Sequence, residues 1–443
     1  MIYRLCHCLW VRVIICITII IFALQWSVYA QSQESGDVLR AGIAKVDITP
    51  EKPVVMFGYV ARGVNLSKGI HDRLYARAVA FENNGKRLLL VSADLGDFYY
   101  GTFEYFQKVI LDEFNLKPSE LFLACTHTHA GPSLTIGKEN EFKMKRADSV
   151  PNSNNLEYTK NLKPKFIQVI REALSNMVPV KTGVGVGYCS VGINRRATRP
   201  DGSVRIGRNP YGPADKEVLV MKIANPDGST RNILFNYACH GTSLGSKNFQ
   251  ISGDFLGLAE QFVEKYLGQG IIAPVFVGAS GDINPWYTSI TEFRVENGWI
   301  PEPELLGIML GEEVIHVLRN IKELNPGGEI ETAFKTIELP SKQLYRDAAL
   351  TEETFPMNIT AARVGDVAFV GFGTEMLTEI GMAIKAGSPF KHTFVITHCN
   401  GASGYLPPMH LYKEGGYEIY SSPFAPQAAD MVVKQALKML FEF

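Results

Sequence analysis

The sequence predicts an α/β protein with a mixed β-sheet core and flanking helices. Three observations support this class. Short apolar runs typical of buried strands are interspersed with amphipathic stretches along the whole chain, and some strand pairs follow one another without a helix between them. No linker clearly divides the chain. With 443 residues, 46% of them hydrophobic, the chain can build one large core or two ordinary ones. We expect a single domain over residues 37–443.

The N-terminus is typical of a targeting segment. Arg4, His7 and Arg12 precede the apolar stretch "VIICITIIIFALQW", and Val28 and Ala30 are small residues suited to cleavage. The apolar stretch is short for a membrane anchor, so a cleaved signal peptide over residues 1–30 is favoured. The mature protein is therefore expected to be exported to the periplasm, the cell surface or the medium.

The first half of the ordered chain predicts strands and helices in alternation. Strands are expected over 38–50, 87–96, 121–125, 183–191, 217–225 and 231–239. Helices are expected over 101–115 and 154–177. Residues 137–156 are polar and predict a surface excursion. Asp94 and two histidines follow successive strand-like runs, at the place where α/β sheets form ligand sites.

The second half continues the same pattern. Helices are expected over 253–268, 303–321 and 424–441. Strands are expected over 271–278, 328–340, 359–373 and 392–399. The sequence shows no internal repeat and no run of like charge. The net charge of −1 gives no electrostatic reason to propose nucleic acid as a partner.

Two histidines follow the apolar run "LFLA" in "CTHTHAGPS". Residues i and i+2 of an extended strand point to the same side, so His127 and His129 are expected to share a face. One imidazole could bind a metal while the other moves a proton or orients a ligand. A pair of polar residues that merely ends a strand explains this motif equally well.

A second apolar run ends in the same way, in "NYACHGTSLG". His240 at this strand tip strengthens the case for a zinc site. In the following "ISGDFLG", Ser252 and Asp254 are explained by helix capping. The corner "GASGDINPW", which contains Asn284, has glycines that allow the backbone to approach a ligand closely.

A carboxylate and a tyrosine-rich loop follow late in the chain. Glu375 comes after a hydrophobic strand and is expected to open a helix, where it could simply favour the helix dipole. It could also complete a zinc site made of two histidines, one carboxylate and water. The loop "CNGASGYLPPMHLYKEGGYEIYSS" contains Tyr405 and Tyr417, and phenols near zinc can bind it or donate to an oxyanion.

In this order the motifs resemble the neutral/alkaline ceramidase family, zinc amidases that cleave the amide bond of ceramide. The resemblance runs from "AGIAKVDITP" to "GGYEIY" and includes "GIHDRLYARA", "THTHAGP", "INRR", "HGTS", "GASGDINP" and "TEMLTEIG". It implies the fold of the family's N-terminal catalytic domain. It also implies one zinc ion per chain, held by His127, His240, Glu375 and Tyr405.

The resemblance assigns further residues to the reaction. Tyr417, twelve residues after Tyr405, corresponds to a second active-site tyrosine. His129 and Arg195 correspond to groups that bind the substrate carbonyl or assist proton transfer. The implied mechanism is attack of a zinc-activated water on an amide carbonyl. Zinc with Tyr417 or Arg195 would stabilise the oxyanion, and His129 would assist the leaving amine.

The chain departs from the family pattern at two places. Where the family has a serine in a "G-x-x-S-P" corner, "GDINP" places Asn284, so a serine nucleophile is not available there and the substrate contacts must differ. The chain also ends at Phe443, soon after the tyrosine loop, so the family's C-terminal immunoglobulin-like domain is expected to be absent.

The leading hypothesis is an exported zinc amidohydrolase that acts on ceramide or a related sphingolipid. Its partner would be a lipid amide substrate, met during transient contact with a membrane surface, and the oligomeric state is left open. A zinc hydrolase of the same fold that acts on another amide or ester is the second hypothesis. A third is a binding protein that kept the fold and lost the metal.

Overall fold

The structure is a computed structural model that describes residues 38–99, 101–136, 153–287, 302–342 and 354–443. The predicted signal peptide, residues 1–30, and most of the predicted polar excursion, residues 137–156, lie outside these ranges. Among the described residues, no helix has both the length and the apolar character needed to cross a membrane.

Three sheets share one order of elements, which the chain builds three times. Each unit has three antiparallel strands, a crossover helix, a strand parallel to the third one, and a second helix. The first unit comprises β1 (Arg40–Asp47), β3 (Tyr75–Asn83), β4 (Lys86–Ala93), α2 (Thr102–Phe114), β5 (Leu121–Cys125) and α3 (Ser153–Ser175). The second comprises β7 (Lys181–Tyr188), β10 (Glu217–Ala224), β11 (Thr230–Tyr237), α4 (Asp254–Leu267), β13 (Val275–Val277) and α5 (Glu302–Asn320). The third comprises β15 (Ile330–Pro340), β16 (Thr354–Val364), β17 (Val367–Phe372), α6 (Thr378–Gly387), β19 (His392–Ile396) and α8 (Ala428–Phe441).

Short elements are inserted between these. The strands are β2 (Gly69–Ile70), β6 (Val178–Pro179), β8 (Gly192–Thr198), β9 (Val204–Asn209), β12 (Gln250–Ile251), β14 (Ile283–Pro285), β18 (Glu375–Met376) and β20 (Tyr405–Leu406). The helical turns are η1 (Val60–Arg62), η2 (Pro118–Glu120), η5 (Met409–Lys413) and α7 (Tyr417–Ser421). The strand pairs β12–β2 and β18–β20 are parallel, and β14–β8–β9 forms a small antiparallel sheet.

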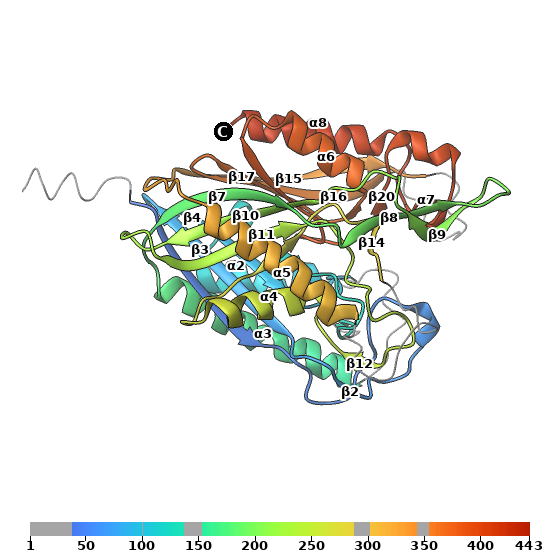
Figure 1. The fold of residues 1–443 in the computed structure, drawn as a ribbon, viewed down its shortest axis with the longest axis horizontal. Helices are drawn as coiled ribbons and strands as arrows, with labels where there is room; N and C mark the ends of the chain where they lie inside the picture. Colours follow the sequence, from blue (N-terminus) through green and yellow to red (C-terminus); the bar gives the residue numbers. More distant parts are fainter. Residues whose placement is uncertain (1–37, 100, 137–152, 288–301, 343–353) are drawn as a thin grey trace, which may run out of the picture.

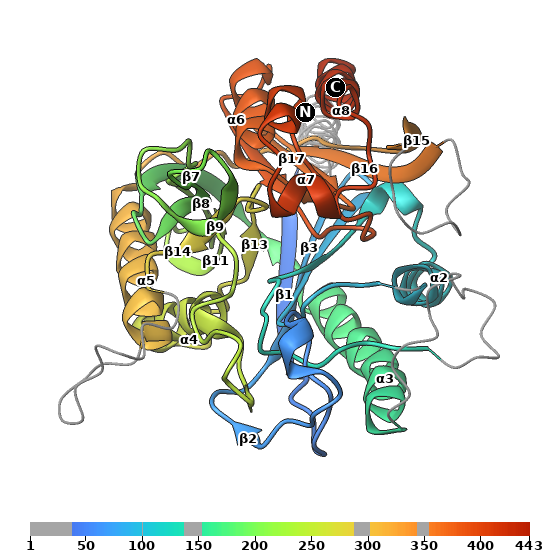
Figure 2. The same ribbon diagram turned by 90° about the vertical axis from the view of Figure 1, so that its right-hand side faces the viewer.

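Each sheet is covered on its outer side by its own two helices. Figure 2 shows α2 and α3 on the right, α4 and α5 on the left, and α6 and α8 at the top, with the sheets between them. The helices are amphipathic; α2, for example, buries Phe103, Phe106 and Ile110, which lie along one face. The inner sides of the three sheets share one apolar core, to which Phe81, Phe276 and Phe394 belong.

The parallel edge strands of the three units meet at the centre of the molecule. Beyond β19, the backbone N–H of Thr397 donates to Val277 O of β13 (2.9 Å), and that of Asn400 donates to Leu123 O of β5 (2.9 Å). The residues that follow these strands are therefore brought together although they are far apart in sequence. The predicted α/β class with mixed sheets and flanking helices is confirmed. The threefold order was not predicted, because it repeats in topology without a detectable repeat in sequence.

Candidate metal centre and active site

His127 and His240 meet at the tips of two strands of different units. His127 follows β5 with a left-handed φ of 56°, a backbone conformation that costs about 1 kcal/mol or more and is concentrated at functional sites. A carbonyl can only accept, so Nδ1–H of His127 donates to Gly96 O (2.7 Å) and Nδ1–H of His240 donates to Ser280 O (2.6 Å). Both rings are buried, and in the neutral form each turns an unprotonated Nε2 inward; burial lowers the pKa of His127, but the facing Glu375 outweighs it and raises this pKa, so a bound ion would take the place of the Nε2 proton.

Glu375 faces these two nitrogens from the third unit. It was expected to open a helix, but it lies on the short strand β18, because its segment pairs in parallel with β20; α6 begins only at Thr378. Its Oε2 lies 3.6 Å from His127 Nε2 and 3.5 Å from His240 Nε2. Its Oε1 accepts a hydrogen bond from the Tyr99 hydroxyl (3.0 Å), whereas Oε2 is buried without a hydrogen-bond partner.

These three side chains have the chemistry of a zinc site. Glu375 Oε2 lies 3.5–3.6 Å from the Nε2 atoms of His127 and His240. Two imidazole nitrogens and one carboxylate oxygen in this arrangement can all bind one ion at bond lengths of about 2.0–2.2 Å. Burial, together with the charge of Arg195, lowers the pKa of His240 to about 3, which keeps this ring unprotonated and able to bind a metal. The partnerless Oε2 of Glu375 is the kind of buried polar atom that an ion would satisfy.

His129 lies beside this centre, next to His127. The two were expected to share a face of an extended strand, but β5 ends at Cys125 and His127 has a left-handed φ, so this turn brings the rings together instead. Its Nε2 is 3.2 Å from His127 Nε2, and a nitrogen of each of the rings His127, His129 and His240 lies within 4.8 Å of the others. Phe57 and Tyr59 pack edge-on against the His129 ring, at 5.5 and 5.1 Å between centroids. Burial and the neighbouring His127 lower the pKa of His129 well below its ordinary value, so the ring is neutral and a weak base.

Arg195 supplies the positive charge of the site. It lies on β8 and is buried, and its guanidinium donates to Glu418 Oε1 (2.8 Å), to the Tyr405 hydroxyl (3.1 Å) and to Asn284 Oδ1 (3.3 Å). A guanidinium held in this way, away from water, is a preorganised donor for negative charge that develops on a substrate. Its NH1 also lies 3.4 Å from His240 Nε2.

The two predicted tyrosines stand side by side over this arginine. Tyr405, on β20, is the register partner of Glu375 on β18, which brings its phenol to the metal centre. The Tyr417 ring, at the start of α7, packs edge-on against the Tyr405 ring (5.6 Å between centroids) and is 48% exposed. All eight residues predicted for the site are therefore assembled in one place: His127, His129, Arg195, His240, Asn284, Glu375, Tyr405 and Tyr417.

Three supporting residues were missed from the sequence. His398 follows β19 and stacks on His127, with ring centroids 3.7 Å apart and an interplanar angle of 13°, and its Nδ1 donates to Asp97 Oδ2 (3.1 Å). Asp97, His127 and His398 also lie close enough to hold an ion. Asp97 Oδ2 already accepts from His398 Nδ1, and the His398 ring packs flat on His127, so we assign the pair Asp97–His398 to the support of His127. His398 ends an apolar strand just as His127 does, and this signal could have identified it.

Nothing in the sequence singles out Glu418, which binds both Arg195 and Arg196.

Asp94, at a predicted strand end, and Asp254, at a predicted helix start, both have protein partners. Asp94 Oδ2 accepts from Tyr75 N (2.8 Å) and pairs with the buried Arg77 (3.3 Å). Asp254 accepts from the backbone N–H groups of Ser243 and Leu244. Asp94 points away from the histidines because its carboxylate is needed by the buried arginine.

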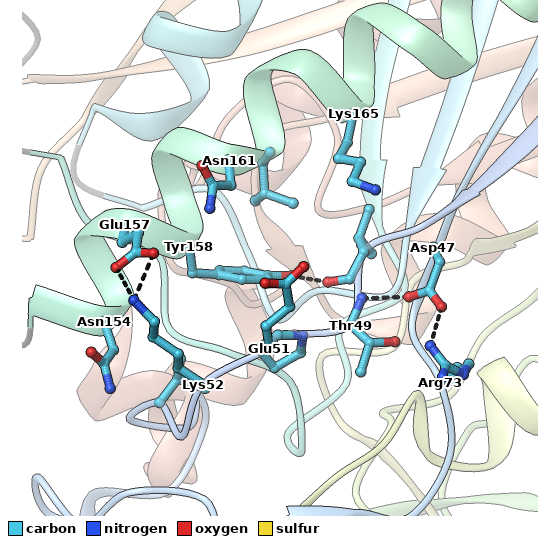
Figure 3. A pocket seen from close by; sticks show the side chains of 14 residues that line it. Asp47, Thr49, Glu51, Lys52, Arg73, Asn154, Glu157, Tyr158, Asn161 and Lys165 are labelled. Carbon is cyan, nitrogen blue, oxygen red and sulfur yellow. Dashed lines mark hydrogen bonds and ion pairs between the residues drawn. The ribbon is translucent and has the colours of Figure 1, made fainter.

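A surface pocket of about 280 Å³ lies between α3 and the loop that follows β1 (Figure 3). Four of its charged lining residues pair with each other: Lys52 binds Glu157, and Arg73 binds Asp47. None of the predicted site residues lines this pocket, so it offers no alternative active site.

Known proteins share both the sequence and the fold. A family model described as neutral/alkaline non-lysosomal ceramidase, N-terminal, matches residues 39–288. The neutral ceramidase of Oryza sativa is 28% identical over 280 residues, which cover 59% of this chain and 33% of that protein. That of Mycobacterium tuberculosis is 26% identical over 273 residues, covering 56% of this chain and 40% of that protein. A crystal structure of neutral ceramidase from Pseudomonas aeruginosa superposes with a TM-score of 0.72 at 18% identity, covering 92% of this chain and 75% of the other.

The chain spans about a third of the length of the first relatives it matches. The family match itself covers more than half of the 443 residues and includes the β5 and β11 tips, Arg195 and Asn284. The remaining site residues, Glu375, Tyr405 and Tyr417, lie beyond the matched range. On this match, the chain belongs to the neutral/alkaline non-lysosomal ceramidase family.

Proposed function

We propose that this protein is an exported, zinc-dependent amidohydrolase that cleaves the N-acyl amide of ceramide or a related sphingolipid into a sphingoid base and a fatty acid. One observation carries the proposal: the buried, partnerless Oε2 of Glu375 lies 3.5–3.6 Å from the inward-facing Nε2 atoms of His127 and His240. Tyr405 completes the proposed ligand set. A zinc ion bound there supplies Lewis-acid polarisation and activates water near neutral pH.

The protein's own side chains would bind and orient the amide around this centre. Arg195 has its guanidinium fixed by Glu418 and directed at Tyr405, so it is suited to donate to the oxyanion that forms when the carbonyl is attacked. The half-exposed Tyr417 hydroxyl is the second donor available at the same side. His129 lies beside the centre and would relay the proton from the attacking water to the leaving amine nitrogen; its lowered pKa favours the release of this proton over its retention.

Asn284 favours a second candidate, a hydrolase of the same mechanism that acts on a different amide or ester. Its Oδ1 accepts from Arg195 at 3.3 Å, so this side chain lies where a substrate bound by Arg195 would be contacted. The Asn284 amide presents two N–H donors on one atom and an acceptor on another. The serine of the family pattern would donate and accept at one hydroxyl oxygen. Substrate contacts at this corner therefore differ from the family pattern.

The test combines metal content with substrate selection. Purified protein is expected to contain one zinc ion per chain and to release free amine from a short-chain ceramide. A chelator should abolish this activity, and added zinc should restore it. A parallel panel of N-acyl amines and esters of matched chain length tests the second candidate, which preferential cleavage of that panel would support. Protein without stoichiometric zinc that added zinc does not activate would exclude both candidates.

A further inference from the structure

A short segment beside the proposed active site carries three exposed aliphatic side chains. Val60 on η1 is 99% exposed, Val64 71% and Ile70 on β2 50%. Aliphatic side chains exposed singly are ordinary, but three within eleven residues make this exposed segment rich in apolar side chains. We name this surface the apolar tip: Val60, Val64 and Ile70.

The other side of the same segment forms a wall of the active site. The Tyr59 ring packs against His129 at 5.1 Å, and a Cβ at Gly58 would lie only 2.4 Å from His129 Nδ1. The buried guanidinium of Arg62 donates to the carbonyl oxygens of Phe57 (3.0 Å), His129 (2.5 Å) and Gly245 (2.9 Å). The segment that carries the tip is therefore anchored to the loop of His129, and its partly exposed Tyr59 borders the candidate site.

The two chain segments that build the apolar tip carry basic but no acidic side chains, although Asp72 and Glu304 border them and pair with His71. Residues 52–71 and residues 242–251 contain no aspartate or glutamate. These segments lie together, because β2 pairs with β12 (lower right in Figure 1) and Lys68 N donates to Phe249 O (2.7 Å). Lys68 and Lys247 are exposed, and the Lys68 ammonium lies 5.1 Å from the centre of the Phe249 ring. Exposed aliphatic side chains flanked by lysines are the composition of interfacial membrane contacts.

We propose that the apolar tip, with Lys68 and Lys247, docks the protein on the surface of an anionic lipid bilayer and so brings the active-site mouth to a lipid amide. The valines and Ile70 enter the interface between headgroups and acyl chains, while the lysines pair with anionic headgroups. The proposal deepens the proposed function, since it names the surface from which a water-insoluble substrate is taken.

Co-flotation with vesicles tests the docking without any substrate. Wild-type protein is expected to bind vesicles of equal parts phosphatidylcholine and phosphatidylglycerol more tightly than vesicles of phosphatidylcholine alone. The double variant Val60→Asp/Val64→Asp should lose about tenfold or more in binding to the mixed vesicles. Lys68→Gln and Lys247→Gln should each lose about fivefold, and added salt should remove this loss. The same losses with Val60→Ser/Val64→Ser would show that the loss of apolar contact matters and not only the added charge.

Phe441→Asp is the matched control, because Phe441 is also exposed (67%) but ends α8 on the other side of the molecule. Binding of the double variant equal to wild type, or an equal loss with Phe441→Asp, would overturn the proposal. So would self-association: a wild-type dimer in ultracentrifugation that the double variant dissociates, without vesicle binding by either, would make the tip an interface between two copies.

The failure of docking and the failure of the proposed function give different results. If both hold, the double variant should cleave a water-soluble short-chain amide at the wild-type rate and lose cleavage of a long-chain amide embedded in vesicles. If only the proposed function fails, no amide is cleaved, yet vesicle binding still depends on the tip. If only docking fails, both substrates are cleaved equally by the variant and the wild type.

Discussion

The tips of β5 and β19 hold equivalent places in the first and third units, and each carries a histidine two residues beyond the strand. His127 and His398 both have left-handed φ angles, 56° and 52°, and their rings stack at 3.7 Å. Only their partners differ. The Gly96 carbonyl holds Nδ1 of His127, so its Nε2 faces Glu375, whereas Asp97 holds Nδ1 of His398, whose Nε2 has no hydrogen-bond partner.

This comparison shows that the backbone position does not by itself decide whether such a histidine binds a metal. Both strand tips deliver a buried ring to the centre, and the ring nitrogen that faces the other ligand groups decides the role. The third unit instead supplies its carboxylate from the end of β17, through Glu375 on β18. We therefore expect the first unit to bind the ion directly and His398 to act through His127.

Replacing each of the two histidines by alanine tests this difference most strongly. His127→Ala is expected to lose stoichiometric zinc and to lower turnover by more than about a thousandfold, because a proposed ligand is removed. His398→Ala should keep zinc but weaken its affinity by about 10- to 100-fold, which is typical of a group that supports a ligand. Zinc content and chelator competition measure both effects. His392→Ala, at the start of β19, is the control that should change neither.

Two outcomes would break the comparison. Full zinc content in His127→Ala would show that the ligands are placed wrongly. Complete zinc loss in His398→Ala, with the protein still folded, would make His398 a ligand in its own right.

The loop that follows β19 contains a second contrast, between two glutamates that bind the same arginine. Glu418 is buried and bridges Arg195 and Arg196, each at 2.8 Å, whereas the Glu414 side chain is 47% exposed and binds Arg196 at 3.1 Å. Glu418→Gln should lower the free energy of unfolding by about 3 kcal/mol, because two buried guanidinium groups lose their countercharge. Glu414→Gln should cost less than about 1 kcal/mol, since solvent screens that pair. Urea unfolding monitored by circular dichroism measures both, and equal costs would show that Glu418 is not the anchor of this loop.

The sequence predicted the histidine half of the site better than the carboxylate half. An apolar run followed by a histidine marks a strand tip, so the local pattern placed His127 and His240 beyond strands, while their assignment as zinc ligands came from the family resemblance. Glu375 was assigned to a helix start, because the parallel pairing of β18 with β20 depends on a loop that returns from far along the chain. The link between Glu418 and Arg195 spans 223 residues and leaves no local pattern. The threefold order of elements was invisible for a similar reason: only the sheet topology repeats.

A substitution of Tyr405 tests whether the tyrosine loop of the third unit contributes to catalysis or only to packing. Tyr405→Phe removes the hydroxyl that accepts from Arg195 at 3.1 Å and should lower turnover by about 10- to 100-fold. Stability should fall by only about 1–2 kcal/mol, because the ring and its packing are kept. Tyr412→Phe is the matched control in the same loop, since its hydroxyl contacts only groups that the site does not use: it donates to Phe424 O (2.7 Å) and lies 3.5 Å from Ser422 Oγ. Wild-type turnover by Tyr405→Phe would remove this loop from the active site.

The smallest effect is expected at Asn284, where the second unit faces the loop of the third. Its bond to Arg195 is long, at 3.3 Å, and Arg195 has shorter bonds to Glu418 and Tyr405, so Asn284→Ser should leave stability unchanged and alter turnover by less than about fivefold. Any effect should appear in the choice between ceramide and other N-acyl amines, because the amide and the hydroxyl offer different hydrogen bonds to the substrate. Asn284→Ala separates the two possibilities. If the serine variant alone gains ceramide hydrolysis, this corner selects the substrate; if both variants match the wild type on every amide, the corner contacts no substrate and the second candidate function loses its support.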